Sequence, residues 1–341
     1  MKNQRATVKD IAKYVGVSAT TVSNVLNKRD GRVSDDIINK VNQAVIALHY
    51  KKNYSALSLV SNKSNLIGVI IPQVEAKKNI MLDNPFYAEF IGDLEYKLRE
   101  AGYHMILSGV GNDDLDISYL ESWNLDGIIL VGAYEAGAYK ALKQLDIPIV
   151  LVDSYVNDDY FYKVRIDDEL GGYIATKYLL DKGHRNIGLV TGEILKEGVA
   201  EKRYMGYRRA LKEYNVEFKN EWLLEKEVSF EWGYEAGKKI AKESFGITAL
   251  FAIADIMATG LISAFHEEKV SVPEEISIIG FDDVMLAKIA TPPLTTVNQN
   301  IHKKAKVSAN VMLSILNGSV PEVHNVLLDI AVVERMSVKE V

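Results

Sequence analysis

Small polar side chains are concentrated between Ser18 and Asn27, and their types suit the reading of DNA base edges. Thr20 can donate a hydrogen bond or contact a thymine methyl group, and Asn24 can pair with adenine. Basic residues on either side of this segment would hold backbone phosphates: Lys9, Lys28, Arg29 and Arg32. The combination indicates a protein that recognises duplex DNA by sequence.

Helical periodicity supplies the elements that would present these side chains. Apolar residues recur at helical spacing in two adjacent stretches: Val8, Ile11, Ala12 and Val15, then Val22, Val25 and Leu26. Gly16 interrupts the pattern between them, and Ser18 is a good N-cap for the second helix. A third amphipathic helix starts at Ser34 and has one apolar face: Ile37, Ile38, Val41, Ala44, Val45 and Leu48. The prediction is a small three-helix core whose second helix projects its first turn outward, toward a major groove.

The charge of the chain is distributed unevenly. Residues 1–64 hold 8 Lys and 3 Arg against 4 Asp and no Glu, a net charge of +7, which leaves −13 on the remainder of a chain with −6 overall. A basic segment on an acidic body fits nucleic-acid binding in which the body is kept away from the phosphates.

Length and composition bound the class of protein. A chain of 341 residues is long enough for two or three folded units at about 150 residues each, and its 48% apolar and 25% charged residues are typical of a globular protein. No apolar run approaches the ~18 residues that a bilayer span requires, and the N-terminus "MKNQRATVKD" lacks the apolar core of a secretion signal. We therefore expect a cytoplasmic protein with no membrane partner.

From Leu66 onward, short apolar runs alternate with amphipathic helices. The runs "LIGVII", "HMIL", "DGIILV" and "IPIVLVD" are followed, after a second set of helices, by "NIGLVTG", "ALFAI" and "ISIIGFDD". This order predicts an α/β body of two units with parallel sheets, and the segment Arg165–Tyr173 is the expected boundary between them. Two such lobes would leave a ligand cleft at their strand ends.

An enzyme is the main alternative from another class, because α/β clefts that carry carboxylates often catalyse. The chain has no cysteine, no phosphate-cradling Gly-Lys loop and six histidines without metal-ligand spacing. We expect no catalytic residues, no metal and no cofactor. A transport binding protein would share the cleft but would need a signal peptide and no basic helices.

The segment "TVKDIAKYVGVSATTVSNVLN" closely resembles the signature of the lactose repressor family, also called LacI/GalR. Val15 stands where that family usually has Ala, and an extra residue near Asp30 and Gly31 lengthens the following loop. The resemblance implies a helix-turn-helix DNA-binding domain over residues 1–52 and a hinge helix over 53–64. Residues expected to contact DNA are Thr7, Ser18, Ala19, Thr20, Thr21, Ser23, Asn24, Asn27, Arg32, Ala56 and Leu59.

The hinge segment "NYSALSLVSNKSN" is too short to be helical by itself. Residues 54–61 make about two turns, below the ~12 to 15 residues at which an isolated helix becomes marginal in water. We expect it to order when two copies meet in a widened minor groove. The resemblance assigns the wedge between central base pairs to Leu59. The family's usual Arg and Pro are replaced here by Leu57 and Asn53, which predicts fewer ionic contacts.

The resemblance continues through "NPFYAEF", "GGYIATKYLLDKGHRNIGLVTG" and "TPPLTTVNQN" and implies a periplasmic-binding-protein-like core over residues 65–341. Lobe 1 is expected at about 65–163 and 296–322, and lobe 2 at about 164–295 and 323–341. Carboxylate and guanidinium groups with an aromatic face are the groups that bind polyols. By the family pattern the effector-binding residues are Phe86, Tyr87, Asp153, Arg203, Asp255, Asp282 and Gln299, whereas Asp283 is a candidate for a structural role.

Two departures bear on the ligand. Ala254-Asp255 stands where the family commonly has Asn-Asp, and an aromatic wall residue is replaced near Val228, with Phe230 and Trp232 as candidates to serve from shifted positions. These changes predict an effector other than a standard hexose.

The expected function is that of a homodimeric repressor of carbohydrate-utilisation genes, bound to a palindromic operator and controlled by a small sugar or phosphosugar. Control by a phosphorylated carrier protein, as in the catabolite-control branch of the family, is the alternative.

Overall fold

The computed structural model describes residues 6–27, 31, 33–50, 63–73, 81–111, 120, 122–132, 142–156, 159–243, 246–319 and 321–341. The chain forms two compact units, Met1–Ser64 and Asn65–Val341. The predicted phosphate contacts Lys28, Arg29 and Arg32 and the hinge residues Ala56, Leu57 and Leu59 lie outside the described residues. No helix in the described ranges is long and apolar enough to cross a membrane.

The N-terminal unit contains the three predicted helices: α1 (Val8–Val15), α2 (Ala19–Leu26) and α3 (Asp35–Ala47). Thr7 and Asp10 form a reciprocal capping box at the start of α1, and α1 ends at Gly16 with a φ of 77°, a conformation that glycine adopts without strain. Ser18 caps α2 as predicted, by accepting a hydrogen bond from the Thr21 N–H at 3.0 Å. Ser34 occupies the N-cap position of α3, but its side chain makes no capping hydrogen bond.

The apolar faces of these helices meet in one small core, which the periodicity predicted. Its buried members are Ile11, Ala12, Val22, Val25, Val41 and Ala44. Burial of these side chains holds α1 against α2 and α3, so the first turn of α2 is left at the surface.

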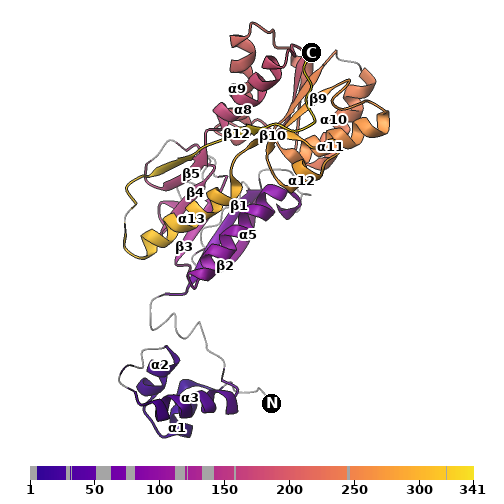
Figure 1. Cartoon of the computed structure of the whole chain (residues 1–341). Helices are drawn as coiled ribbons and strands as arrows, with labels where there is room; N and C mark the ends of the chain where they lie inside the picture. The colour runs from indigo at the N-terminus through magenta and orange to yellow at the C-terminus, as the bar shows by residue number, and fades with distance from the viewer. Residues whose placement is uncertain are drawn as a thin grey trace. The chain divides into compact units, whose positions relative to one another are not determined.

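The larger unit consists of two six-stranded sheets, which form two lobes (Figure 1). Lobe 1 has, in spatial order, β11 (Asn325–Leu328), β5 (Tyr162–Ile166), β4 (Ile149–Val152), β3 (Gly127–Val131), β1 (Leu66–Gln73) and β2 (His104–Gly111), all paired in parallel. Their central strands are apolar at every position, as expected for a parallel sheet covered on both faces.

Lobe 2 has, in spatial order, β12 (Ala331–Val333), β10 (Thr295–Asn298), β9 (Ser277–Asp282), β8 (Ala249–Ala252), β6 (Ile187–Gly192) and β7 (Leu223–Lys226). Its pairs are parallel except for the edge strand β12, which runs antiparallel to β10. The predicted α/β body with two parallel-sheet units is therefore confirmed.

Helices pack in pairs beside the sheets (Figure 1). In lobe 1, α5 (Pro85–Glu100) lies against α13 (Ile301–Leu316), and the short 3-10 helix η1 (Met81–Asp83) precedes α5. In lobe 2 the pairs are α8 (Asp168–Asp181) with α9 (Val199–Glu213), and α10 (Phe230–Glu243) with α11 (Asp255–Glu268). The remaining short elements are η2 (Asn220–Trp222) and α12 (Met285–Ile289).

The chain passes between the sheets after β5, after β10 and after β11, and this places some boundaries differently from the sequence prediction. Residues 164–166 belong to lobe 1, because β5 extends to Ile166, whereas residues 296–298 belong to β10 in lobe 2. The larger difference is β11: it pairs with β5 in lobe 1, although the sequence prediction gave all of 323–341 to lobe 2. The predicted return of residues 300–318 to lobe 1 is confirmed by the packing of α13 on α5 and β3 to β5.

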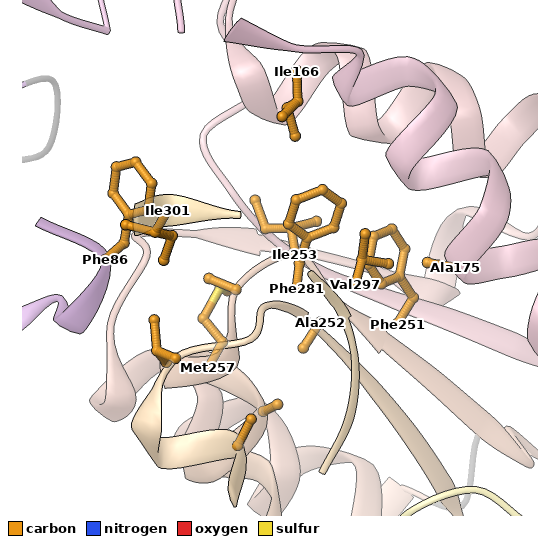
Figure 2. Packing of buried hydrophobic residues seen from close by; sticks show 14 of the residues in the cluster. Phe86, Ile166, Ala175, Phe251, Ala252, Ile253, Met257, Phe281, Val297 and Ile301 are labelled. Atoms are coloured by element: carbon orange, nitrogen blue, oxygen red, sulfur yellow. The ribbon is translucent and has the colours of Figure 1, made fainter. Parts of the chain in front are cut away.

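One hydrophobic cluster runs through both lobes. It includes Phe86, Ile166 and Ile301 beside lobe 1 and Phe281 and Val297 in lobe 2, as Figure 2 shows. Apolar contact of this kind favours a defined lobe arrangement. Two members of the cluster, Phe281 and Phe86, lie beside cations described next.

Candidate functional site

A buried ion pair in lobe 1 is the starting point of the site. Lys304 lies in α13 with none of its surface exposed, and its ammonium donates to both carboxylate oxygens of Asp153 at 2.7 Å. Asp153 follows β4 directly and is itself buried. Its φ of 50° is a left-handed conformation that Asp tolerates better than most residues. Sheet and helix thus bring together two residues that are 151 positions apart.

Gln299 connects this pair to lobe 2. Its side-chain oxygen accepts a hydrogen bond from the Lys304 ammonium, and its side-chain nitrogen donates to Asp282 Oδ1. Gln299 lies in the crossover between β10 and α13 and is fully buried, while Asp282 ends β9 with a φ of 120°. Strained backbone conformations of this kind cluster at active sites and ligand sites.

Arg203 continues the polar connection inside lobe 2. From α9 it donates Nε–H to Asp168 Oδ1 at 2.8 Å and Nη1–H to the Ile253 carbonyl oxygen, and Nη1 lies 3.8 Å from Asp282 Oδ1. The guanidinium carbon stands 3.6 Å from the centre of the Phe281 ring, a stacking contact that also stabilises the charge.

Tyr155 closes the connection back to lobe 1. Its hydroxyl donates to Asp168 Oδ2 at 2.7 Å, and the Asp168 backbone N–H donates to the same hydroxyl at 2.9 Å. Tyr155 lies two positions after Asp153 in the loop that follows β4. Seven side chains therefore form a continuous chain of polar contacts across the lobe junction, which we name the interlobe network: Asp153, Lys304, Gln299, Asp282, Arg203, Asp168 and Tyr155.

Burial dominates the electrostatics of this network. It raises the pKa of Asp282 to about 7, although Arg203 and the hydrogen bond from Gln299 favour the ionised form. Burial also raises the pKa of Asp153, and here Lys304 opposes the shift. The network carries three carboxylates against two cations, so a raised proton affinity at one carboxylate is the expected response.

Of the seven residues predicted to bind an effector, the network contains Asp153, Arg203, Asp282 and Gln299. Phe86 borders it: the Lys304 ammonium lies 5.3 Å from the centre of its ring. Tyr87 is adjacent in the chain and half-buried, and its ring meets that of Phe86 edge to face with centroids 5.3 Å apart.

Asp255 is placed elsewhere. Its side chain is fully buried inside lobe 2, where the carboxylate accepts hydrogen bonds from the Thr296 hydroxyl at 2.6 Å and from the Val284 N–H at 3.1 Å. Burial raises its pKa well above the ordinary value. These contacts tie α11 to β10 and to the loop before α12, a structural role for the side chain.

Asp283 and the aromatic candidates also have internal partners. Asp283 accepts hydrogen bonds from Arg335 and, at 2.7 Å, from Asn298, which agrees with the structural role considered for it. Trp232 is half-buried and donates its ring N–H to the Thr191 carbonyl oxygen at 3.2 Å, and Phe230 is partly exposed.

Sequence reasoning missed Lys304, Asp168 and Tyr155. A signal for Lys304 was available, because it shares a helical face with Ile301, Ala305, Ser308 and Met312, and a lysine among such residues needs a buried partner. No comparable pattern marks Asp168 or Tyr155. Within the described parts of the chain, no group of three or more His, Asp or Glu side chains could hold a metal ion.

Most of the residues predicted to contact DNA lie in α2 or at its two caps, Ser18 and Asn27, whereas Thr7 is the N-cap of α1. Ala19 and Thr20 are exposed, whereas Thr21, Ser23, Asn24 and Asn27 are half-buried. Asn27 donates its side-chain N–H to the Ser23 hydroxyl at 3.3 Å, and the hydroxyls of Thr7 and Ser18 act as helix caps. Thr20 is therefore an exposed polar side chain of this group whose hydroxyl is not engaged in a helix cap.

Comparison with known proteins agrees with both units. Residues 7–53 match the family model described as bacterial regulatory proteins, lacI family, and residues 176–338 match a periplasmic binding protein-like domain. The repressor PurR of Histophilus somni is 33% identical over 340 residues, covering 98% of this chain and 99% of the relative. The chain belongs to the lacI family. This lacI-family protein is accordingly a DNA-binding transcriptional repressor and not an enzyme.

The names of two further similar proteins mention ribose. The ribose operon repressor of Haemophilus influenzae is 31% identical to this lacI-family chain over 337 residues, covering 98% of both. A solved LacI family transcriptional regulator from Enterococcus faecium, with bound ribose, is 27% identical with a TM-score of 0.71, covering 81% of this chain and 99% of that one.

Proposed function

We propose that this repressor acts in the cytoplasm as a homodimer on palindromic operators of carbohydrate-utilisation genes, and that a small hydroxyl-rich effector bound at the interlobe network controls its operator affinity. A single α2 covers too few base pairs for useful selectivity, and two-fold pairing on a palindrome supplies the second half-site.

The observation that carries the effector site is a donor and an acceptor left over at the centre of the network. Arg203 Nη2 and Asp282 Oδ2 make no hydrogen bond to any residue that the structure describes, while both side chains are almost entirely buried. A sugar carries neighbouring hydroxyls that can donate to such a carboxylate and accept from such a guanidinium. Polar groups in this position favour a ligand that completes their hydrogen bonds.

Control of DNA binding follows from the position of the network between the lobes. Asp153 and Lys304 belong to lobe 1, Arg203 and Asp282 to lobe 2, and Gln299 links the two pairs. A ligand that bonds Arg203 and Asp282 of lobe 2 and also contacts Phe86 of lobe 1 would stabilise one lobe arrangement relative to others. Coupling of about 1–3 kcal/mol is typical between two such sites and would change operator affinity about 5- to 150-fold.

The segment at residues 53–64 is our candidate for the connection to DNA. Its sequence predicts a helix that orders only when two copies pack in the minor groove, with Leu59 inserted between base pairs. Amide exchange tests this step: equal protection of residues 54–61 in free protein and in the operator complex would contradict it.

The proposed function is tested by operator binding in the presence of a panel of uncharged sugars that begins with D-ribose. Fluorescence anisotropy on an operator selected in vitro should show an affinity change of about fivefold or more with at least one sugar. The matched variant Gln299→Leu should bind the operator but lose the response. Operator affinity that ignores every sugar, but changes when a phosphorylated carrier protein is added, would replace this proposal with the protein-gated alternative.

A further inference from the structure

Lys304 has no hydrogen-bonding capacity to spare. A lysine ammonium has three N–H donors, and here they face both oxygens of Asp153 and the side-chain oxygen of Gln299. The side chain is fully buried, and its ammonium also lies 5.3 Å from the centre of the Phe86 ring. A ligand could bond this ammonium only by taking the place of Asp153 or Gln299.

Each cation of the network already faces at least one carboxylate, and the network holds three carboxylates against two cations. Lys304 faces Asp153, and Arg203 faces Asp168 at 2.8 Å and Asp282 at 3.8 Å. An anionic ligand would add to this excess, and it would leave Asp153 as a buried carboxylate without its counter-ion. Residues 65–341 carry a net charge of −13, so the long-range field also disfavours anions.

An uncharged polyol meets none of these obstacles. Its hydroxyls can reach the unused Arg203 Nη2 and Asp282 Oδ2 while the Lys304–Asp153 pair stays intact. Asp153 and Gln299 therefore act on the choice of ligand through Lys304, because they occupy a cation that would otherwise be free to bind an anion.

We propose that the Lys304–Asp153 pair is a specificity determinant: because Asp153 and Gln299 occupy every donor of Lys304, the site accepts uncharged, hydroxyl-rich effectors and excludes phosphorylated and carboxylated ones. The proposal rests on the proposed function only in placing the effector at the interlobe network. It narrows the effector class expected from the sequence, which included phosphosugars.

The test is a gain of anion binding, measured without DNA on the full-length protein. Asp153→Asn removes the counter-ion of Lys304 and keeps the shape of the side chain, and Asn tolerates the positive φ at this position. Calorimetric titration with inorganic phosphate and with D-ribose 5-phosphate should give no binding to the wild type. The variant should bind either probe at least about tenfold more tightly, because a charge-assisted hydrogen bond to a released cation is strong.

Two further variants make the outcome specific. Asp153→Asn combined with Lys304→Met should lose the gained affinity, whereas Asp153→Asn combined with Lys303→Met should keep it, because Lys303 is the exposed neighbour in the same helix. A folded Asp153→Asn variant without any gain would overturn the proposal.

If Asp153→Asn fails to fold, the same titrations of the wild type and of the single Lys304→Met variant still test the proposal. Tighter binding of D-ribose 5-phosphate than of D-ribose by the wild type, abolished by Lys304→Met, would show that Lys304 recruits anions and would refute the idea. No anion binding by either protein supports it. Failure of the proposed function would appear instead as operator affinity that ignores uncharged sugars, in an experiment that shares no readout with this one.

Discussion

Tyr155 and Asp168 bind each other twice where the chain passes from lobe 1 to lobe 2. The Tyr155 hydroxyl donates to the Asp168 carboxylate at 2.7 Å and accepts from the Asp168 backbone N–H at 2.9 Å. Burial raises the pKa of Tyr155, so the hydroxyl keeps its proton. Asp168 also bonds Arg203, and the loop after β4 is thereby connected to the groups proposed to bind the effector.

Tyr155→Phe should lower the free energy of unfolding of the core by about 1–3 kcal/mol, because the Asp168 carboxylate loses one of its two side-chain partners and the Asp168 backbone N–H loses its acceptor. Urea unfolding monitored by circular dichroism measures this. Tyr160→Phe is the control, since that ring is exposed in the same lobe, and it should change stability by less than about 0.5 kcal/mol. Equal effects of the two variants would mean that the hydroxyl of Tyr155 contributes nothing.

Arg203→Met should cost about 3–5 kcal/mol, because it leaves Asp168 buried without its cation. Arg209→Met is the control, because Arg209 lies in the same helix as Arg203 and pairs with Glu169 of α8. That ion pair is exposed to solvent and should contribute less than about 1 kcal/mol to stability. Chemical unfolding of both variants, at one pH and salt concentration, compares them directly. Similar losses would contradict the structure of the network.

The raised pKa of Asp282 leads us to expect that the stability of the protein depends on pH. Its folded pKa is about 7 and its ordinary value is 3.8, so between these values the folded protein binds more protons than the unfolded chain. Stability contributed by protonated Asp282 is present at low pH and declines as the pH rises toward and through 7. The stability of the wild type relative to Asp282→Asn should therefore fall between pH 5 and pH 8.

Urea titrations of both proteins across this range give the difference. Asp329→Asn serves as the control, because Asp329 is exposed in the connection between β11 and β12, and it should leave the wild-type profile unchanged. A constant difference between wild type and Asp282→Asn would exclude a raised pKa at this residue.

Thr20→Ala should weaken operator binding while leaving the N-terminal unit folded. Thr20 is exposed on the first turn of α2, and one lost base contact costs about 1–3 kcal/mol, or about 5- to 150-fold in affinity. Gln43→Ala, at an exposed position of α3, should bind as the wild type does. Anisotropy titration at fixed salt compares the three proteins, and an unchanged Thr20→Ala affinity would remove this residue from the reading surface.

Local patterns in the sequence were sufficient for the elements but not for all their partners. Gly16 and Ser18 locate the turn and the second helix by themselves, because capping and left-handed backbone involve only neighbouring residues. Strand β11 could not be assigned in this way. Its pairing with β5 instead of a lobe 2 strand depends on where the chain crosses between the sheets, and the apolar pattern of four residues is the same for either sheet.

The site shows the same division. The family pattern named Asp153, Arg203, Asp282 and Gln299, but it assigned Asp255 to the ligand, whereas the fold directs that carboxylate to Thr296 inside lobe 2. A spacing along the chain cannot show which of two adjacent positions faces inward at the start of a helix such as α11.

The order of helices and strands, the position of α2 and its caps, and the charge difference between the two units follow from the amino-acid sequence, because each depends on residues close together in the chain. The meeting of Lys304 with Asp153, and its link through Gln299 to Asp282, was decided by tertiary structure alone. Long-range packing brings those side chains within bonding distance, and burial then sets their protonation and the ligands they accept.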